Sequence, residues 1–345
     1  MKNYSNFKIK KKSFISYKKI MIIAEIGSNH DNSLSKCKKL ILEAKKAGCD
    51  AVKFQLFKAE KLVSKRLNYK GFSLLKKLEL NESWLPIIAK YCKEKKILFI
   101  CSPFYLEAVN LLIKNKCDIL KIASPEIKNI PLLKKVVKSK LPIIISTGDT
   151  NKKIIKNAIN NLKINSYHKV AFLHCTSEYP CSLKNANLLN LINLRKMINN
   201  KISIGYSDHT AGIDSSLIAV SMGANIVEKH ITLNKKSKGP DHFFALDIKE
   251  LKLMVNKIRN FEKMTGSFDK IRLKDENTVF INIFSNKIIL KNTRIQESDI
   301  ICKRDYTEGI DSMNIKNIIS KKINKTIKDD TKFKYSMFFN YKKND

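Results

Sequence analysis

The sequence predicts an α/β fold, a (β/α)8 TIM barrel, followed by a small C-terminal β-rich domain. The first 266 residues alternate eight times between short segments rich in Ile and Val and segments with apolar residues at helical spacing. Eight such alternations favour a closed parallel barrel. The alternative is an open doubly wound sheet, but no glycine-rich dinucleotide loop follows the first strand.

The expected barrel strands are short and predominantly apolar. They comprise residues 21–27, 51–55, 97–102, 119–123, 142–147, 170–175, 202–206 and 225–231. The helical segments between them include residues 33–48, where Leu40, Ile41 and Ala44 recur at helical spacing before Gly48. Glycine often ends a helix because it adopts the left-handed conformation at little cost. The last expected helix ends at Gly266.

Changes in sequence character divide the chain into three parts. Residues 1–266 form the barrel domain, with a basic lead-in over residues 1–19 that we expect to be a hairpin closing the bottom of the barrel. Residues 267–278 are polar and charged and read as a linker. From residue 279 to residue 345 short strand-like and turn-like segments follow one another, which predicts a second, small domain.

The charge of the chain invites a nucleic-acid interpretation, which the residue types argue against. The formal net charge is +36, yet only six of the 67 basic residues are arginine. Specific base readout favours arginine, and no nucleic-acid motif is present. We attribute the charge to a bias toward lysine and asparagine, with the lysines on solvated helix faces. Attraction of small anionic substrates into a site is a weaker alternative.

No segment indicates a membrane span or a secreted protein. No apolar run reaches the about 18 residues that a transmembrane helix needs. The basic N-terminal segment has no apolar core of signal-peptide length, so we expect a cytoplasmic protein. The eight cysteines form no CxxC pair and are expected to be buried and reduced. Cys175 lies beside the expected site, but the sequence offers it no activating base.

Polar residues gather at the C-terminal ends of the expected strands, where barrel enzymes place their active sites. Lysines in a barrel mouth are costly unless they meet an anion, so several of them among serines indicate a substrate with a phosphate and a carboxylate. The segment 146–148 precedes a helix and suits a phosphate cradle. The strand-end residues are Glu25, Lys53, Gln55, Ser102, Lys121, Ser124, Ser146, Ser177, Tyr179, Ser207, His209, Glu228, Lys229 and His230.

Two histidines end neighbouring expected strands, which suggests a shared divalent metal. Imidazole ligands with open positions for water or substrate suit Mn²⁺, with Zn²⁺ as an alternative. For His209 or His230 taken alone, a hydrogen-bonded structural histidine remains an open interpretation. Barrel closure would bring Glu25 near His230, and a carboxylate beside a cation and substrate is a candidate for proton transfer.

Several motifs in order resemble the sialic acid synthase family. They are IIAEIGSNHDNSLSKCKKLILEAKKAGCDAVKFQLFKAEKLV, LKIASPEIKNIPLLK, PIIISTG, LHCTSEYP, GYSDHTAGI and EKHITL…GPDH, and they span essentially the whole barrel. The segment that begins VFINIFSNKIIL is similar, more weakly, to that family's C-terminal antifreeze-like (SAF) domain.

The resemblance implies a condensation of phosphoenolpyruvate with an N-acyl-mannosamine-type sugar and water. The products would be a nonulosonic acid and phosphate, with N-acetylneuraminate from N-acetylmannosamine expected first. A legionaminate or pseudaminate synthase using a diacetamido-dideoxy sugar is the alternative. An aldolase with a Schiff-base lysine is a further one. A basic binding protein on a barrel that has lost its activity is a non-enzyme alternative.

The resemblance also assigns roles to residues of this chain. His209 and His230 match metal ligands, with Mn²⁺ expected and Mg²⁺ or Co²⁺ as alternatives, and Glu25, Glu228 and His230 match catalytic positions. The substrate-binding positions would be Lys53, Gln55, Ser102, Lys121, Ser124, Ser146, Ser177, Tyr179, Ser207, Asp241 and Arg304. In the family the small domain reaches into the partner's barrel, so Arg304 would act across a domain-swapped homodimer.

The chain departs from the family pattern at four positions. Asn32 stands where NHNG-type turns have glycine, and asparagine tolerates the left-handed conformation that such a turn needs. Asp305 replaces the proline of a KRPG pattern after Arg304. Pro125 follows Ser124, and Ser177 stands where some members carry asparagine, which affects how the phosphate or sugar would be held.

Overall fold

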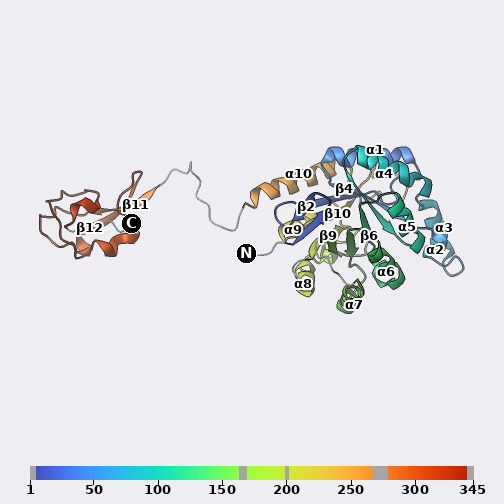
Figure 1. The fold of residues 1–345 in the computed structure, drawn as a ribbon. Helices are drawn as coiled ribbons and strands as arrows, with labels where there is room; N and C mark the ends of the chain where they lie inside the picture. The colour runs from blue at the N-terminus through green and yellow to red at the C-terminus, as the bar shows by residue number, and fades with distance from the viewer. Residues whose placement is uncertain (1–4, 163–168, 199–201, 267–278, 340–345) are drawn as a thin grey trace. The chain divides into compact units, whose positions relative to one another are not determined.

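The structure is a computed structural model that describes residues 5–162, 169–198, 202–266 and 279–339 (Figure 1). The chain forms two compact units, residues 1–266 and residues 267–345. The expected linker at residues 267–278 lies outside the described residues. Each unit is treated by itself below.

The first unit is a closed barrel of eight parallel strands, as predicted. Its strands pair in the order β10-β3-β4-β5-β6-β7-β8-β9, so the first strand of the barrel lies beside the last. The strands are β3(Met21–Glu25), β4(Ala51–Leu56), β5(Leu98–Pro103), β6(Ile119–Ile122), β7(Ile143–Ser146), β8(Val170–Cys175), β9(Ser203–Asp208) and β10(Ile226–His230).

Helices follow the strands and surround the barrel (Figure 1). Ser33 accepts a hydrogen bond from the backbone of Lys36 at the start of the first helix, and Gly48 ends that helix with φ 92°. The α-helices are α1(Leu34–Ala47), α2(Ala59–Leu62), α3(Tyr69–Leu78), α4(Leu85–Glu94), α5(Leu106–Lys114), α6(Ile130–Lys138), α7(Lys152–Leu162), α8(Asn190–Met197), α9(Asp214–Ser221) and α10(Ile248–Met264). Short 3-10 turns are η1(Glu82–Trp84), η2(Pro125–Lys128) and η4(Leu183–Ala186).

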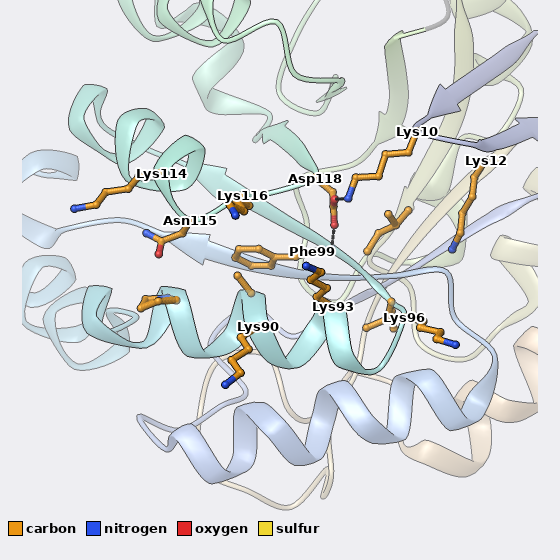
Figure 2. A pocket seen from close by; sticks show the side chains of 14 residues that line it. Lys10, Lys12, Lys90, Lys93, Lys96, Phe99, Lys114, Asn115, Lys116 and Asp118 are labelled. Carbon is orange, nitrogen blue, oxygen red and sulfur yellow. Dashed lines mark hydrogen bonds and ion pairs between the residues drawn. The ribbon is translucent and has the colours of Figure 1, made fainter.

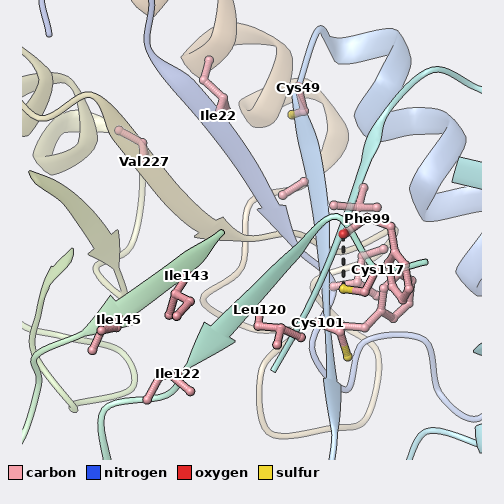
Figure 3. Packing of buried hydrophobic residues seen from close by; sticks show 14 of the residues in the cluster. Ile22, Cys49, Phe99, Cys101, Cys117, Leu120, Ile122, Ile143, Ile145 and Val227 are labelled. Carbon is pink, nitrogen blue, oxygen red and sulfur yellow. Dashed lines mark hydrogen bonds between the residues drawn. The ribbon is translucent and has the colours of Figure 1, made fainter. Parts of the chain in front are cut away.

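Successive side chains of each barrel strand point alternately outward and inward, and this divides the buried apolar residues into two cores. Residues that point outward pack beneath the helices, among them Ile22, Phe99 and Leu120 (Figure 3). Cys49, Cys101 and Cys117 fill the same layer as small apolar groups (Figure 3). Seven of the eight cysteines are buried, as expected, whereas Cys302 in the second unit is exposed.

The inward-facing residues at the lower end of the strands form the second core. The hairpin of β1(Asn6–Ile9) and β2(Lys12–Ile15) contributes Phe7, Ile9 and Phe14 to this core, and all three are buried. The expected lead-in hairpin therefore closes the bottom of the barrel. Its partners from the strands are Met21, Ile23, Ala51, Leu98, Ile100, Ile119, Ile144, Ala171, Leu173 and Ile226.

The second unit is small and β-rich. Strand β11(Phe280–Ser285) pairs antiparallel with β12(Ile300–Asp305), and the 3-10 turns η5(Glu297–Asp299), η6(Ser312–Asn317) and η7(Tyr335–Met337) complete the unit. Arg304 is exposed and pairs in register with Ile281. The carboxylate of the next residue, Asp305, accepts hydrogen bonds from the backbone N–H groups of Tyr306 and Thr307. It also forms an ion pair with Lys332 at 2.6 Å. An aspartate carboxylate thus fixes the turn after Arg304, where the resembling family has proline.

Within the described part of the chain, no helix is long and apolar enough to cross a membrane.

We predict that truncating the hairpin core destabilises the barrel. Phe14 is fully buried, so Phe14→Ala should lower the free energy of unfolding by about 3–5 kcal/mol. Urea denaturation measures this change. Lys11→Ala, at an exposed position of the same hairpin, is the control and should change stability by less than about 0.5 kcal/mol. Equal effects of the two substitutions would show that the hairpin does not complete the core.

Candidate active site

Four ionisable side chains form one buried layer inside the barrel, directly above the apolar floor. Successive residues of a strand point to opposite faces, so Glu25 and Lys53 follow the inward-facing Ile23 and Ala51 at a spacing of two. In the same way, Lys121 follows the inward-facing Ile119 by two residues, and Glu228 follows the inward-facing Ile226 by two residues. Register pairing places Glu25 opposite Lys53 on the neighbouring strand and opposite His230 on the other side.

The charges in this layer neutralise one another. Lys53 Nζ lies 3.1 Å from Glu25 Oε1 and 3.2 Å from Glu228 Oε1. Lys121 Nζ lies 3.8 Å from Glu228 Oε2. Gln55 Nε2 donates to Glu25 Oε1 at 2.7 Å. Because a buried charge without a partner is costly, these contacts explain how the barrel tolerates the four groups.

The two carboxylates differ in their affinity for a proton. Burial raises the pKa of Glu25 to about 7, against the lowering effect of the Lys53 ammonium. Burial also favours the neutral form of Glu228, but Lys121 and Lys53 outweigh it and lower the pKa of Glu228 to about 2. Burial lowers the pKa of Lys121 as well. Near neutral pH, Glu25 is therefore the carboxyl group able to exchange a proton.

Hydroxyl groups surround the lysines on the side of strands β5, β6, β7 and β9. Lys121 Nζ donates to Ser146 Oγ at 2.5 Å, and Ser207 Oγ donates to Glu228 Oε1 at 3.2 Å. Ser102 Oγ is buried without a hydrogen-bond partner among the described residues. Glu25 Oε2 and Glu228 Oε2 are also buried without a hydrogen-bond partner among the described residues. Buried polar atoms without partners mark a place where a ligand would complete the hydrogen bonding.

A backbone amide lies among three polar side chains at the end of β7. Gly148 N donates to Ser124 Oγ at 2.9 Å. A Cβ at Gly148 would lie 2.5 Å from Ser177 Oγ and 2.9 Å from Ser124 Oγ, so a larger residue would force these hydroxyl groups to shift. A polar cavity of about 520 Å³ adjoins this point, and Thr147, Cys175 and Ser177 contribute to its lining.

The two predicted metal ligands lie side by side. The ring centroids of His209 and His230 are 5.7 Å apart. His209 Nδ1 lies 2.8 Å from the carbonyl oxygen of Thr176, and His230 Nδ1 lies 3.7 Å from Asp241 Oδ2. Metal-binding histidines characteristically present one ring nitrogen to an oxygen and the other to the metal. His209 fits this pattern, whereas His230 Nδ1 is buried without a hydrogen-bond partner among the described residues.

The protein supplies only a partial ligand set for that cation. Within the described ranges, no group of three or more His, Cys, Asp or Glu side chains is arranged to hold a metal ion. Two imidazoles would therefore leave the remaining positions to water or substrate, as in metal sites that act on a bound substrate.

Aromatic and polar residues border the histidines. Tyr179 lies over His209 with ring centroids 4.1 Å apart and is half exposed. Phe244 packs against His230 at 5.2 Å, a contact that sequence reasoning missed although the residue follows Asp241 closely. Asp241 Oδ2 also accepts a hydrogen bond from Ser28 at 3.1 Å, which ties the loop after β10 to the loop after β3.

Cys175 is closer to the chemistry than the sequence indicated. Its Sγ lies 3.8 Å from His209 Nδ1, the ring nitrogen that also lies 2.8 Å from the Thr176 carbonyl oxygen. Burial raises the pKa of the thiol, but His209, Lys121 and Ser124 together outweigh burial, and the pKa of Cys175 is lowered. Only the pairing of β8 with β9 reveals this contact, because 34 positions separate the two residues.

Lys229 does not face the site, and its placement at the barrel mouth is a wrong prediction. Strand alternation turns Lys229 outward between the inward-facing Glu228 and His230. Its Nζ lies 2.9 Å from Asp208 Oδ2 and donates to the Thr210 carbonyl oxygen at 2.6 Å. Asp208 also accepts hydrogen bonds from Ser215 and Ser216. This buried pair joins the two segments that carry His209 and His230.

Fold and site together are those of a barrel enzyme, with ionisable groups gathered at the carboxyl ends of its strands. The chain matches the NeuB family over residues 40–270. It is 38% identical over 331 residues to the N,N'-diacetyllegionaminic acid synthase of Campylobacter jejuni, which covers 91% of this chain and 98% of that protein. The chain belongs to the NeuB family.

Two further relatives broaden the comparison. The pseudaminic acid synthase of Campylobacter jejuni is 32% identical over 332 residues, covering 92% of this chain and 96% of that protein. The crystal structure of an N-acetylneuraminic acid synthetase from Leptospira borgpetersenii matches with a TM-score of 0.74 at 31% identity, covering 80% of this chain and 95% of that chain. These relatives are named as synthases of three different sugar acids.

The Asp208–Lys229 pair should be a large contributor to barrel stability. Lys229→Met leaves a buried aspartate unpaired and should lower the free energy of unfolding by about 3–5 kcal/mol. Replacing both partners with apolar residues should recover much of that loss. Lys76→Met breaks exposed contacts with Glu60 and Glu79 and should change stability far less. Chemical denaturation compares the variants, and no recovery in the double variant would contradict this account.

The raised pKa of Glu25 predicts a pH dependence of stability. Between about pH 4.5 and 7 the folded chain keeps the Glu25 proton that the unfolded chain releases, so stability falls as pH rises through this window. Glu25→Gln removes this component, which is on the order of 3 kcal/mol in total. Denaturation of both proteins from pH 4.5 to pH 8 measures the difference. A difference independent of pH would refute the raised pKa.

Proposed function

We propose that the chain is a nonulosonic acid synthase. It would join the methylene carbon of phosphoenolpyruvate to the aldehyde carbon of an acylated amino sugar, add water and release phosphate. The observation that carries the proposal is the buried layer of Lys53, Lys121 and serines beside two histidines whose Nδ1 atoms both face an oxygen. Membership of the NeuB family supports the same reaction class.

The lysines and hydroxyl groups suit phosphoenolpyruvate because its phosphate and carboxylate need cations and hydrogen-bond donors. With Glu25 protonated, Lys53 and Lys121 face one ionised carboxylate, Glu228, so the layer has cationic charge to spare. Ser102, Ser124, Ser146, Ser177 and Ser207 supply donors around it. Donors fixed in a water-poor barrel need no reorganisation when charge develops during the reaction.

His209 and His230 would hold a divalent metal, with Mn²⁺ as the first candidate. When bound, the metal would supply Lewis-acid polarisation of a carbonyl group. The carbonyl of Thr176 would orient the ring of His209, and the carboxylate of Asp241 lies 3.7 Å from Nδ1 of His230. Tyr179 and Phe244 shield the rings and limit the entry of water.

Glu25 is the group we assign to proton handling. Its pKa of about 7 allows it to release and accept a proton near neutral pH, when water adds and phosphate leaves. Gln55 holds one of its oxygens and leaves the other without a partner among the described residues. Glu228 remains ionised and would stabilise positive charge near the reacting carbons.

Two sugars compete as the second substrate. The 38% identity to an N,N'-diacetyllegionaminic acid synthase over nearly its full length favours a diacetamido-dideoxy sugar. The N-acetylneuraminic acid synthetase at TM-score 0.74 and the LHCTSEYP motif support N-acetylmannosamine, the substrate expected from the sequence. We rank the diacetamido sugar first.

The second unit would serve the site as an antifreeze-like domain. Arg304 is exposed on β12, and Asp305 fixes the turn after it, so its guanidinium is available to a sugar. We propose that it reaches the barrel of a partner subunit in a domain-swapped homodimer.

A substrate panel tests the reaction. Purified protein with Mn²⁺ and phosphoenolpyruvate is given each candidate sugar, and phosphate release and product mass are measured. We expect phosphate and a nonulosonic acid in equal amounts with one of the two sugars. Absence of phosphate release with every sugar would contradict the proposal and leave an inactive binding protein.

Borohydride trapping distinguishes the proposed synthase mechanism from that of a Schiff-base aldolase. Burial lowers the pKa of Lys121, a property that such an enzyme would need. A covalent adduct with pyruvate after reduction would therefore establish the aldolase and overturn the proposed mechanism. We expect no adduct, because Lys121 lies beside an ionised carboxylate and a serine.

Metal binding should depend on both histidines. His209→Ala and His230→Ala should each weaken Mn²⁺ binding by more than about tenfold, since loss of an outer partner alone costs that much. Electron paramagnetic resonance of free Mn²⁺ measures binding without relying on activity. His174→Gln is the matched control, because His174 contacts the Ala186 carbonyl oxygen and lies outside the pair. Unchanged Mn²⁺ affinity in both alanine variants would remove them as ligands.

A further inference from the structure

A second hollow lies at the opposite end of the barrel from the site described above. It has a volume of about 640 Å³ and lies between the β1–β2 hairpin, helix α4 and the turns that precede β5 and β6 (Figure 2). Its strand residues, Leu98 and Phe99, are at the start of β5, whereas the functional residues are at the strand ends. A volume of this size falls in the range of small-molecule sites. We call it the lysine hollow.

The floor of the lysine hollow is apolar. Pro86 and Ala89 come from helix α4, and Ile97 joins them from the turn before β5. Phe99 and Leu98 lie beneath and are nearly fully buried. A floor of this kind offers contact to a flat apolar group rather than to a fully hydrated ion.

The walls of the lysine hollow are cationic. Lys10 pairs with Asp118, whose other oxygen accepts a hydrogen bond from the backbone of Phe99. Lys12, Lys93 and Lys116 also line the hollow (Figure 2), and no carboxylate within the described ranges pairs with them. Lys90 and Lys114 extend away from its centre (Figure 2). Several like charges around one space repel one another, and an anion between them relieves that repulsion.

Two of the lysines adopt a left-handed backbone conformation, which glycine would adopt at a lower cost in free energy. Lys96 and Lys116 have φ of 53° and 56° at the turns before β5 and β6, whereas the equivalent turn before β4 uses Gly48. A side chain in the left-handed region costs free energy that glycine avoids. Both lysines are exposed and line the hollow. Lys140, at the turn before β7 and outside the lining, adopts the same conformation with φ 59°, so the conformation is shared by these turns.

We propose that the lysine hollow binds a nucleoside polyphosphate. Its planar base would lie on the apolar floor of Pro86, Ala89 and Ile97, and its phosphates would lie among Lys12, Lys93 and Lys116. Charge complementarity favours an anionic ligand over a neutral one, and the apolar floor favours a ligand with a flat apolar group over a simple inorganic anion. A volume of about 640 Å³ suits one nucleotide rather than a strand of nucleic acid. The site is separate from the proposed synthase site and does not depend on it.

Calorimetry and thermal unfolding at 0.15 M salt test the proposal with three probes: ATP, inorganic tripolyphosphate and adenosine. We expect ATP to bind and to raise the unfolding midpoint, because a ligand of the folded state stabilises it. Tripolyphosphate should bind more weakly, and adenosine should have little effect. Equal affinity for ATP and tripolyphosphate would overturn the proposal, because the floor would then contribute nothing.

Matched variants locate the binding. The triple variant K12Q/K93Q/K116Q should weaken ATP binding by about tenfold, since three exposed ion pairs are lost. The control K90Q/K114Q removes lysines that point away and should retain affinity within about twofold. Saturating phosphoenolpyruvate should leave ATP affinity unchanged. Equal loss in both variants, or displacement of ATP by phosphoenolpyruvate, would overturn the assignment to this hollow.

Discussion

The mutual neutralisation of Glu25, Lys53, Lys121 and Glu228 is the constraint on which the candidate site depends. None of these groups could be buried alone without shifting its pKa or unfolding the barrel. Together they satisfy one another through contacts of 3.1 to 3.8 Å. The arrangement leaves oxygen atoms of both glutamates without hydrogen-bond partners among the described residues. An anionic substrate would thus meet two ammonium groups that already contact Glu25 and Glu228, and it would exchange one set of ionic partners for another.

Most of the barrel could be predicted because its signal is repeated. Eight apolar segments with helical segments between them are compatible with few folds other than a (β/α)8 barrel. Polar residues at the ends of the strands then identify the mouth of the barrel. The direction of each side chain was harder to read. Glu228, Lys229 and His230 are all ionisable, so the pattern does not show which residue faces inward, and Lys229 was misplaced for this reason. Cys175 and His209 meet only through the β8–β9 register, which no local pattern encodes.

The departures from the family pattern are accommodated by local chemistry. Asn32 adopts φ 49°, the left-handed conformation that the replaced glycine would adopt. Asp305 fixes its turn through carboxylate hydrogen bonds instead of a proline ring. Ser177 is shorter than asparagine and lies close to Gly148, where little space remains. At these three positions the side chain that holds the loop differs from the family pattern, and the backbone conformation of the loop is maintained by other contacts.

Closure of the barrel by β10 against β3 has a consequence for biosynthesis. Met21 pairs with Ile226, and Glu25 pairs with His230, so about 200 residues separate strands that are neighbours in space. A chain growing on the ribosome has made Glu25 and Lys53 long before Glu228 and His230 exist. The charge balance and both histidines come together only when the last strand docks. A nascent chain therefore cannot bring the two histidines beside Glu25 early, and the layer of charged groups is complete only in the finished barrel.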